Sequence, residues 1–151
     1  MQTLFQQMNQ RLAQGESLVL VSVEASSGST PRGEGAMMLV SAQGRIAGTI
    51  GGGAVEYRSE QLAREALAAG RSRVERFQLR PNEVQDLGMI CGGDVEVSFR
   101  YLAGGDEAAI AWAREEEARL TPSGRVYIFG GGHVAQALVP ALAAVDFRCV
   151  V

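Results

Sequence analysis

The sequence contains no lysine, one histidine and two cysteines, and each scarcity excludes a kind of active site. All 14 basic residues are arginine, so the chain can build neither a lysine Schiff base nor a Walker-type phosphate loop, which requires lysine. His133 alone cannot form a multi-histidine metal site. Cys91 and Cys149 are far apart and form no Cys-x-x-Cys pair, which argues against zinc binding.

The sequence also lacks a long apolar run and a surplus of positive charge. No window approaches the ~18 apolar residues that a membrane span needs. Residues 1–15 show no basic start followed by an apolar stretch, so we expect no secretion signal. Reduced thiols and a cytoplasmic location are then the default expectation. A formal net charge of -3 gives no electrostatic footprint for nucleic acid, so we expect neither nucleic acid nor membrane as a partner.

Glycine, in contrast, is abundant, with 19 residues in a chain of 151, where about 7% is ordinary. Most of these glycines gather between regular segments, where they indicate close backbone approach or positive φ angles. The four clusters lie at residues 28–35, 48–53, 88–93 and 130–132.

Hydrophobic periodicity predicts an α/β fold for the first 120 residues. Helices are predicted over residues 3–14, 54–69 and 106–120. Strands are predicted over residues 17–25, 36–42, 45–50, 74–79 and 94–102, with a hairpin turn at Gln43-Gly44. Together these elements predict an N-terminal domain, residues 1–120, with a mixed sheet flanked by helices. A linker is expected at residues 121–124 (Thr-Pro-Ser-Gly).

Residues 125–151 predict an incomplete Rossmann-like domain that holds only the first βαβ unit. A strand at 125–129, a glycine turn, a helix at 133–145 and a strand at 147–151 follow one another. A lone βαβ unit cannot cover both faces of a parallel sheet. Its exposed strand invites pairing with another chain, so we expect a homodimer, with domain swapping as one route.

The turn before the last helix fits the dinucleotide-binding pattern G-x-G-x-x-A. Its defining positions are Gly130, Gly132 and Ala135, and His133 belongs to the same turn. Backbone N–H groups at such a helix start attract a pyrophosphate. The complete fingerprint also needs an acid about 20 residues on, and residues 149–151 supply none. We favour a tight turn that binds nothing over an NAD(P) site, and we expect His133 to cap or pack against the helix.

A second strand-to-helix turn, Gly51-Gly52-Gly53, would also direct N–H groups at an anion. Glu56 follows about one helical turn later. Two interpretations of this acid are open. It complements the helix dipole, or it accepts hydrogen bonds from a ring that presents paired N–H donors.

Cys91 and Arg32 lie in glycine-rich loops, and each has a structural and a functional interpretation. If Gly92 and Gly93 turn their N–H groups toward the Cys91 sulfur, the thiolate is favoured and reactive. Otherwise Cys91 is a buried apolar residue. Arg32 is a solvated charge, or it holds an anionic ligand in bidentate geometry. The small hydroxyl residues around Arg32 are Ser27, Ser29 and Thr30.

Three segments, by their order and spacing, resemble the signature of the XdhC/CoxI family, the xanthine dehydrogenase accessory proteins. They are GSTPRGEGA at 28–36, GTIGGGAVE at 48–56 and LGMICGG at 87–93. We refer to them as motifs one, two and three. FGGGHVA at 129–135 is similar to the opening of the family's C-terminal Rossmann-like domain.

This resemblance implies a non-catalytic chaperone for the molybdenum cofactor, molybdopterin. Such a protein binds the cofactor while a cysteine desulfurase supplies its sulfido ligand, and delivers it to a xanthine dehydrogenase-type molybdenum hydroxylase. Arg32 and the Gly51–Gly53 turn are expected to hold the phosphate, Glu56 the pterin N–H edge, and Cys91 to lie near the molybdenum or handle sulfur. The expected cofactor-binding residues are Ser29, Thr30, Arg32, Gly51, Gly52, Gly53, Glu56, Cys91, Gly92 and Gly93. The alternatives are an NAD(P)-dependent oxidoreductase on the Gly130–Ala135 turn and a subunit-contact module without ligand.

Overall fold

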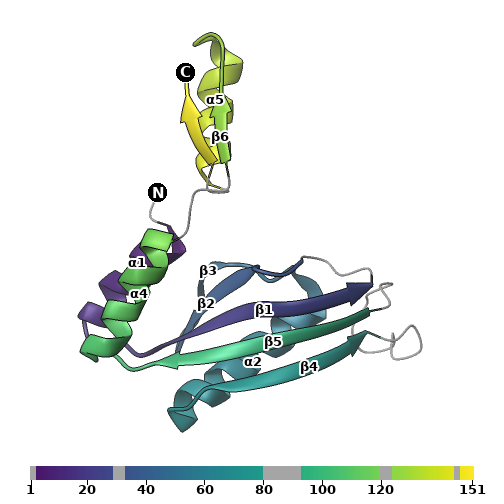
Figure 1. Ribbon diagram of the computed structural model, residues 1–151, viewed down its shortest axis with the longest axis vertical. Helices are drawn as coiled ribbons and strands as arrows, with labels where there is room; N and C mark the ends of the chain where they lie inside the picture. The colour runs from purple at the N-terminus through teal and green to yellow at the C-terminus, as the bar shows by residue number, and fades with distance from the viewer. Residues whose placement is uncertain (1–2, 29–32, 80–92, 120–123, 145–146) are drawn as a thin grey trace.

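The computed structural model describes residues 3–28, 33–79, 93–119, 124–144 and 147–151. These residues form a five-stranded sheet with helices on both faces, and a separate two-stranded parallel sheet near the C-terminus (Figure 1). The α/β class predicted from the sequence is therefore confirmed. None of the helices in these ranges is long and apolar enough to cross a membrane.

The large sheet has the strand order β3-β2-β1-β5-β4. Its strands are β1 Leu18–Gly28, β2 Met37–Ser41, β3 Gly44–Gly48, β4 Arg73–Leu79 and β5 Gly93–Leu102. All five were predicted, with boundaries shifted by one to three residues. β1 is central, and its first residues, Leu18–Val21, are buried on both faces, which explains the continuous apolar sequence there.

The prediction of a mixed sheet was wrong, because every neighbouring pair of strands in this sheet is antiparallel. β3 and β4, which flank the long helix in sequence, do run in the same direction. They lie at opposite edges, however, with three strands of alternating direction between them. The helix thus crosses the whole sheet and does not join two adjacent parallel strands.

Two hydrophobic clusters hold the helices against the sheet. Helix α2, Gly53–Ala69, packs on one face, where Val19, Val21 and Phe99 are fully buried. Helices α1, Leu4–Ala13, and α4, Glu107–Arg119, lie side by side on the other face (Figure 1). The alternation of side chains along β1 supplies both clusters, since successive strand residues point to opposite faces.

The helix ends follow local sequence signals. Thr3 and Gln6 form a reciprocal capping box at the start of α1. α2 ends at Gly70, which adopts the left-handed conformation with φ 61°, as the sequence predicted. The connection between β5 and α4 passes close to the end of α1, where a Cβ on Gly104 would lie 2.1 Å from the Gly15 carbonyl oxygen.

The C-terminal unit comprises β6 Gly124–Tyr127, α5 His133–Ala143 and β7 Phe147–Val150. β6 and β7 pair in parallel, so the predicted βαβ unit is present. Its large apolar side chains are mostly in solvent, and Phe129 is 99% exposed. The division into domains at 1–120 and 125–151 stays a prediction.

Candidate functional site

Motifs one and three meet at one end of the five-stranded sheet, and motif two begins beside the point where motif one returns to the sheet. Gly28, the first residue of motif one, lies opposite Gly93, the last residue of motif three, in the β1–β5 register. Motif one returns to the same strand, since the Gly35 N–H donates to the Val23 carbonyl at 3.0 Å. Gly48, which begins motif two, pairs with Met38 on the neighbouring β2. Because Met38 pairs in turn with Val21, motif two begins level with Val21 and short of the Gly28 end of β1.

Motif two makes a turn that depends on glycine. Gly48, Gly51, Gly52 and Gly53 have φ values of 75°, 128°, 77° and 63°, all in the region that L side chains rarely adopt. At Gly48 space is restricted as well, because a Cβ there would lie 2.3 Å from the Met37 carbonyl oxygen. The turn brings the end of β3 directly into α2 and leaves Gly53 as the first, exposed residue of that helix.

The Glu56 carboxylate closes this turn from within. Its Oε2 accepts hydrogen bonds from the backbone N–H groups of Ile50 at 3.0 Å and Gly52 at 3.1 Å. The Thr49 hydroxyl donates to the same oxygen. Oε1 receives the Arg45 Nη1 at 2.5 Å. Four donors therefore converge on one carboxylate, whose side chain is only 13% exposed.

This environment favours the ionised form of Glu56. Burial alone raises the pKa of the carboxyl group, because it disfavours charge. The hydrogen bonds from Thr49 and the two backbone N–H groups, together with the charge of Arg45, more than offset that effect and lower the pKa below its ordinary value. The turn at the start of α2 therefore already holds an anion, supplied by the chain itself.

The structure brings part of the predicted site together. Gly51, Gly52 and Glu56 are in one hydrogen-bonded cluster, since the Gly51 N–H donates to Thr49 Oγ1 at 3.1 Å and Thr49 in turn donates to Glu56. Gly93 lies across from Gly28 at the same end of the sheet. The remaining predicted residues of this site fall outside the described ranges: Ser29, Thr30, Arg32, Cys91 and Gly92.

Thr49 and Arg45 are members of this cluster that the sequence analysis did not single out. Thr49 lies inside motif two, so its hydroxyl next to a glycine turn was an available signal. Arg45 gave no such signal. It is on β3, 11 residues before Glu56, and meets it only because the turn folds α2 back beside that strand.

Comparison with known proteins identifies a family for part of the chain. The sequence model of the XdhC and CoxI family matches residues 11–78. Residues 11–78 therefore form an XdhC/CoxI family domain. The matched range includes motifs one and two, the Glu56 cluster and four of the five strands, whereas motif three and residues 124–151 lie beyond it.

Two relatives extend this comparison. An uncharacterised Escherichia coli (strain K12) protein, YqeB, is 32% identical over 132 residues, covering 87% of this chain and 21% of YqeB. The chain thus spans about a fifth of that relative's length. A solved structure described as a xanthine dehydrogenase from Bacillus halodurans superposes with a TM-score of 0.59 over 76% of this chain and 34% of its own. Its identity of 21% makes this a likeness of fold.

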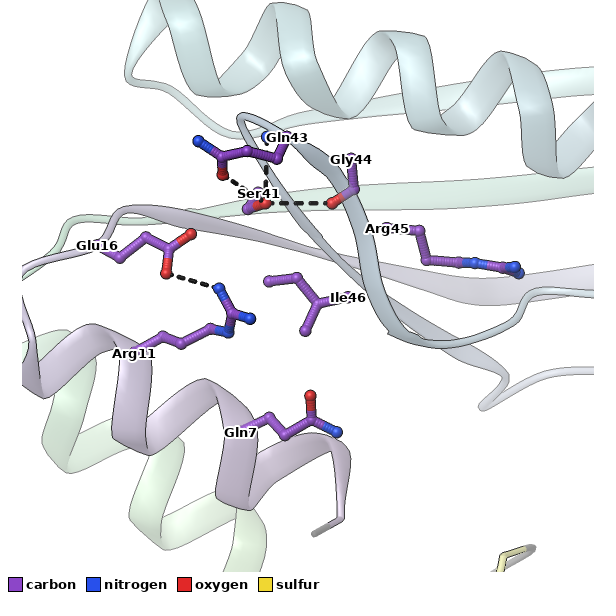
Figure 2. Close-up of a pocket in the computed structure, with 8 residues that line it drawn as sticks. All are labelled: Gln7, Arg11, Glu16, Ser41, Gln43, Gly44, Arg45 and Ile46. Atoms are coloured by element: carbon purple, nitrogen blue, oxygen red, sulfur yellow. Dashed lines mark hydrogen bonds and ion pairs between the residues drawn. The ribbon is translucent and has the colours of Figure 1, made fainter. Parts of the chain in front are cut away.

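A hollow of about 660 Å³ lies at a different place, beside the β2–β3 hairpin. Polar side chains line most of it, and Figure 2 shows the Arg11 guanidinium paired with Glu16 at 2.8 Å. Arg45 is the one lining residue shared with the Glu56 cluster, and its side chain extends away from the others (Figure 2). None of the described residues that line the hollow belongs to the predicted cofactor site.

The C-terminal glycine turn is formed as expected for a βα connection. Gly130 has φ 108°, and Gly132 precedes α5 without a side-chain cap. Ala135 is buried at 7% exposure. His133 is the first residue of α5 and is exposed, and the expectation that it caps or packs stays a prediction. β7 carries no carboxylate that would hold a ribose.

Within the described ranges, no group of three or more histidine, cysteine, aspartate or glutamate side chains is arranged to hold a metal ion. Cys149, on β7, is a partly buried free thiol.

Proposed function

We propose that this chain binds the molybdenum cofactor and acts, without catalysing a reaction of its own, in the maturation of a xanthine dehydrogenase-type molybdenum hydroxylase. Membership of the XdhC/CoxI family supports this class of function. The observation that carries the proposal is the pairing of Gly28 with Gly93, which joins motif one to motif three, while motif two begins on β3 beside the return of motif one to β1. In this proposal a single ligand spans the three motifs.

The Glu56 cluster refines the roles that these residues take in the proposal. Two N–H groups of the turn already donate to Glu56, so the carboxylate shapes the turn before any ligand arrives. A pterin N–H group that reaches Glu56 would do so at Oε1, replacing the Arg45 guanidinium. The released guanidinium, 46% exposed, would then be free to pair with the cofactor's phosphate. We assign the rest of the phosphate site to Gly53, Arg32 and the Ser29 and Thr30 hydroxyls.

We assign sulfur handling to Cys91, with Gly92 and Gly93 beside it in motif three. A thiolate flanked by N–H groups is a suitable acceptor for sulfur from a cysteine desulfurase. In this proposal the desulfurase and the target molybdenum hydroxylase are the two partner proteins. Self-association through the C-terminal unit, β6 to β7, completes the proposed assembly.

Titration with molybdenum cofactor released from a molybdenum hydroxylase tests the proposal, with transfer to the cofactor-free enzyme as a second readout. The parent chain should bind and deliver the cofactor. Glu56→Gln and Cys91→Ala should bind or deliver less, while Glu60→Gln, a surface variant on the same helix, should behave as the parent does. If both site variants match the parent, the proposed site is wrong.

The formed turn between β6 and α5 favours one second candidate, an NAD(P)-dependent oxidoreductase. The open N–H groups at the start of α5 suit a pyrophosphate. This candidate leaves motifs one to three without a role. Binding of NADH that is lost in Gly132→Asp, with no binding of pterin, would support it over the cofactor chaperone.

A further inference from the structure

β1 contains a β-bulge shortly before it reaches motif one. Up to Val23, which lies opposite Val97, the register between β1 and β5 runs without interruption. Ala25 then lies opposite Glu96, so one extra residue, Glu24, is inserted in β1. Glu24 and Ala25 are both exposed, although successive strand residues otherwise point to opposite faces. The bulge therefore exchanges the faces to which the following residues of β1 point.

This exchange places Ser26 on the face of the sheet that α2 covers. Ser26 lies opposite Val95, and directly opposite residues of an antiparallel pair share a face. Val95 is buried in the hydrophobic cluster that packs against α2, so the half-buried Ser26 belongs to that face as well. Gly28, two residues further on, lies opposite Gly93 in the same alternation. In an uninterrupted strand, Ser26 would point to the other face.

The face opposite α2 is acidic at this end of the sheet. Asp94 and Glu96 alternate with the α2-facing residues of β5, so they point away from α2. Glu24 lies on the same face, since its carboxylate accepts a hydrogen bond from the Ser98 hydroxyl. Arg76 pairs with Glu96 at 2.6 Å and offsets one of these three carboxylates. The remaining negative charge disfavours an anionic ligand on this face.

We propose that the ligand of the three motifs occupies the α2 face of the sheet and that the Ser26 hydroxyl donates a hydrogen bond to its phosphate. This inference rests on the proposed function, which supplies the ligand class, a pterin that carries a phosphate. It adds a residue that lies outside the three motifs. The bulge at Glu24 then has a positioning role, because it directs the hydroxyl to the face on which motif two leads into α2. β-Bulges beside binding sites re-aim side chains in this way.

Titration of the chain with a pterin monophosphate, and with the same pterin lacking the phosphate, tests the inference. Ser26→Ala loses a hydrogen bond to a charged group, so it should bind the phosphorylated pterin about tenfold more weakly. Its binding of the other pterin should stay unchanged. Ser26→Thr, which keeps the hydroxyl, should match the parent.

Two control variants test the face as well as the hydroxyl. The double variant Ala25→Ser, Ser26→Ala moves the hydroxyl to the opposite face and should be as weak as Ser26→Ala. Ser22→Ala removes a half-buried hydroxyl from that opposite face, ahead of the bulge, and should match the parent. Thermal unfolding of each variant checks that the fold is intact.

The outcomes separate the inference from the function on which it rests. If Ser26→Ala binds the phosphorylated pterin as the parent does, or if the double variant regains the parent's affinity, the role of Ser26 is wrong and the proposed function stands. If Ser26→Ala weakens binding of both pterins equally, the hydroxyl does not contact the phosphate, which also overturns the inference. If the parent binds neither pterin, the proposed function and the role of Ser26 fail together.

Discussion

Gly28 on β1 lies directly opposite Gly93 on β5, and this pair joins the first residue of motif one to the last residue of motif three. The relationship explains why glycine-rich segments so far apart in sequence belong to one site. Motif one begins where β1 ends, and motif three ends where β5 begins. Antiparallel pairing of β1 with β5 brings the end of one strand beside the beginning of the other. Motif two begins at Gly48 on β3, which reaches β1 through the pairing of β3 with β2 and of β2 with β1.

Gly48→Ala should lower the free energy of unfolding by about 2–4 kcal/mol. The substitution combines a positive φ of 75° with a Cβ placed 2.3 Å from the Met37 carbonyl oxygen. Gly52→Ala is a matched control, because its φ of 77° is similar and no atom lies within 4 Å of the added Cβ. It should cost only the backbone strain, about 1–3 kcal/mol. Urea denaturation of both variants measures the difference, and equal losses would contradict the steric account of Gly48.

Glu56→Gln should lower stability by about 2 kcal/mol at neutral pH, because the amide cannot accept from four donors as the carboxylate does. The folded-state pKa of Glu56 is lowered, so its contribution is fully present above the unfolded value of about 4.3. That contribution is lost as the pH falls through the folded-state pKa. The parent should therefore lose its advantage over Glu56→Gln in acid.

Urea denaturation of the parent and Glu56→Gln between pH 7 and pH 3 measures this convergence. Glu60→Gln, which removes an exposed ion pair with Arg64 four residues on, should cost only a few tenths of a kcal/mol. A gap between the parent and Glu56→Gln that does not narrow in acid would show that ionisation of Glu56 does not hold the turn.

Cys91→Ser should reduce delivery of active, sulfurated cofactor to the target hydroxylase at least tenfold while leaving cofactor binding within about twofold. The thiolate, and not the hydroxyl, is the group that accepts and donates sulfur. Cys149→Ser, on β7, is the control and should deliver as the parent does. Unimpaired delivery by Cys91→Ser would remove Cys91 from sulfur handling.

The C-terminal unit should mediate self-association. Phe129, which follows β6, is 99% exposed and Val134, on α5, is 80% exposed, so this unit presents large apolar side chains to solvent. We expect the parent to sediment as a dimer at tens of micromolar, and a Phe129→Asp, Val134→Asp double variant to sediment as a monomer. Val74→Asp on β4 serves as the control. A parent that remains monomeric over this range would contradict the expectation.

The sequence predicted every described helix and strand, because each has its own periodicity and glycine boundaries. Strand direction in the sheet was not predictable in the same way. β3, α2 and β4 follow one another as in a parallel crossover, and only the insertion of β2, β1 and β5 between the two edge strands makes the sheet antiparallel. That insertion is a long-range property that no local pattern encodes.

The candidate site, like the sheet, was predictable where it depends on neighbouring residues and not where it depends on long-range contacts. Glycines that need positive φ and an acid near a helix start are visible as residue types at short spacing, so Gly51, Gly52 and Glu56 were found. The partner of that acid was not found, since Arg45 reaches Glu56 from a different strand. Nor could spacing reveal that the carboxylate is already bound by the turn's own N–H groups.

The most direct test of the central claim, that the motif-bearing end of the sheet holds the molybdenum cofactor, is the pterin content of the chain purified from cells that make this cofactor. The parent should retain pterin in near-stoichiometric amount, measured by the fluorescence of its oxidised form. Gly48→Ala, which distorts the turn, should lose most of it, while Glu60→Gln retains it. Absence of pterin from the parent, or equal retention by Gly48→Ala, would contradict the claim.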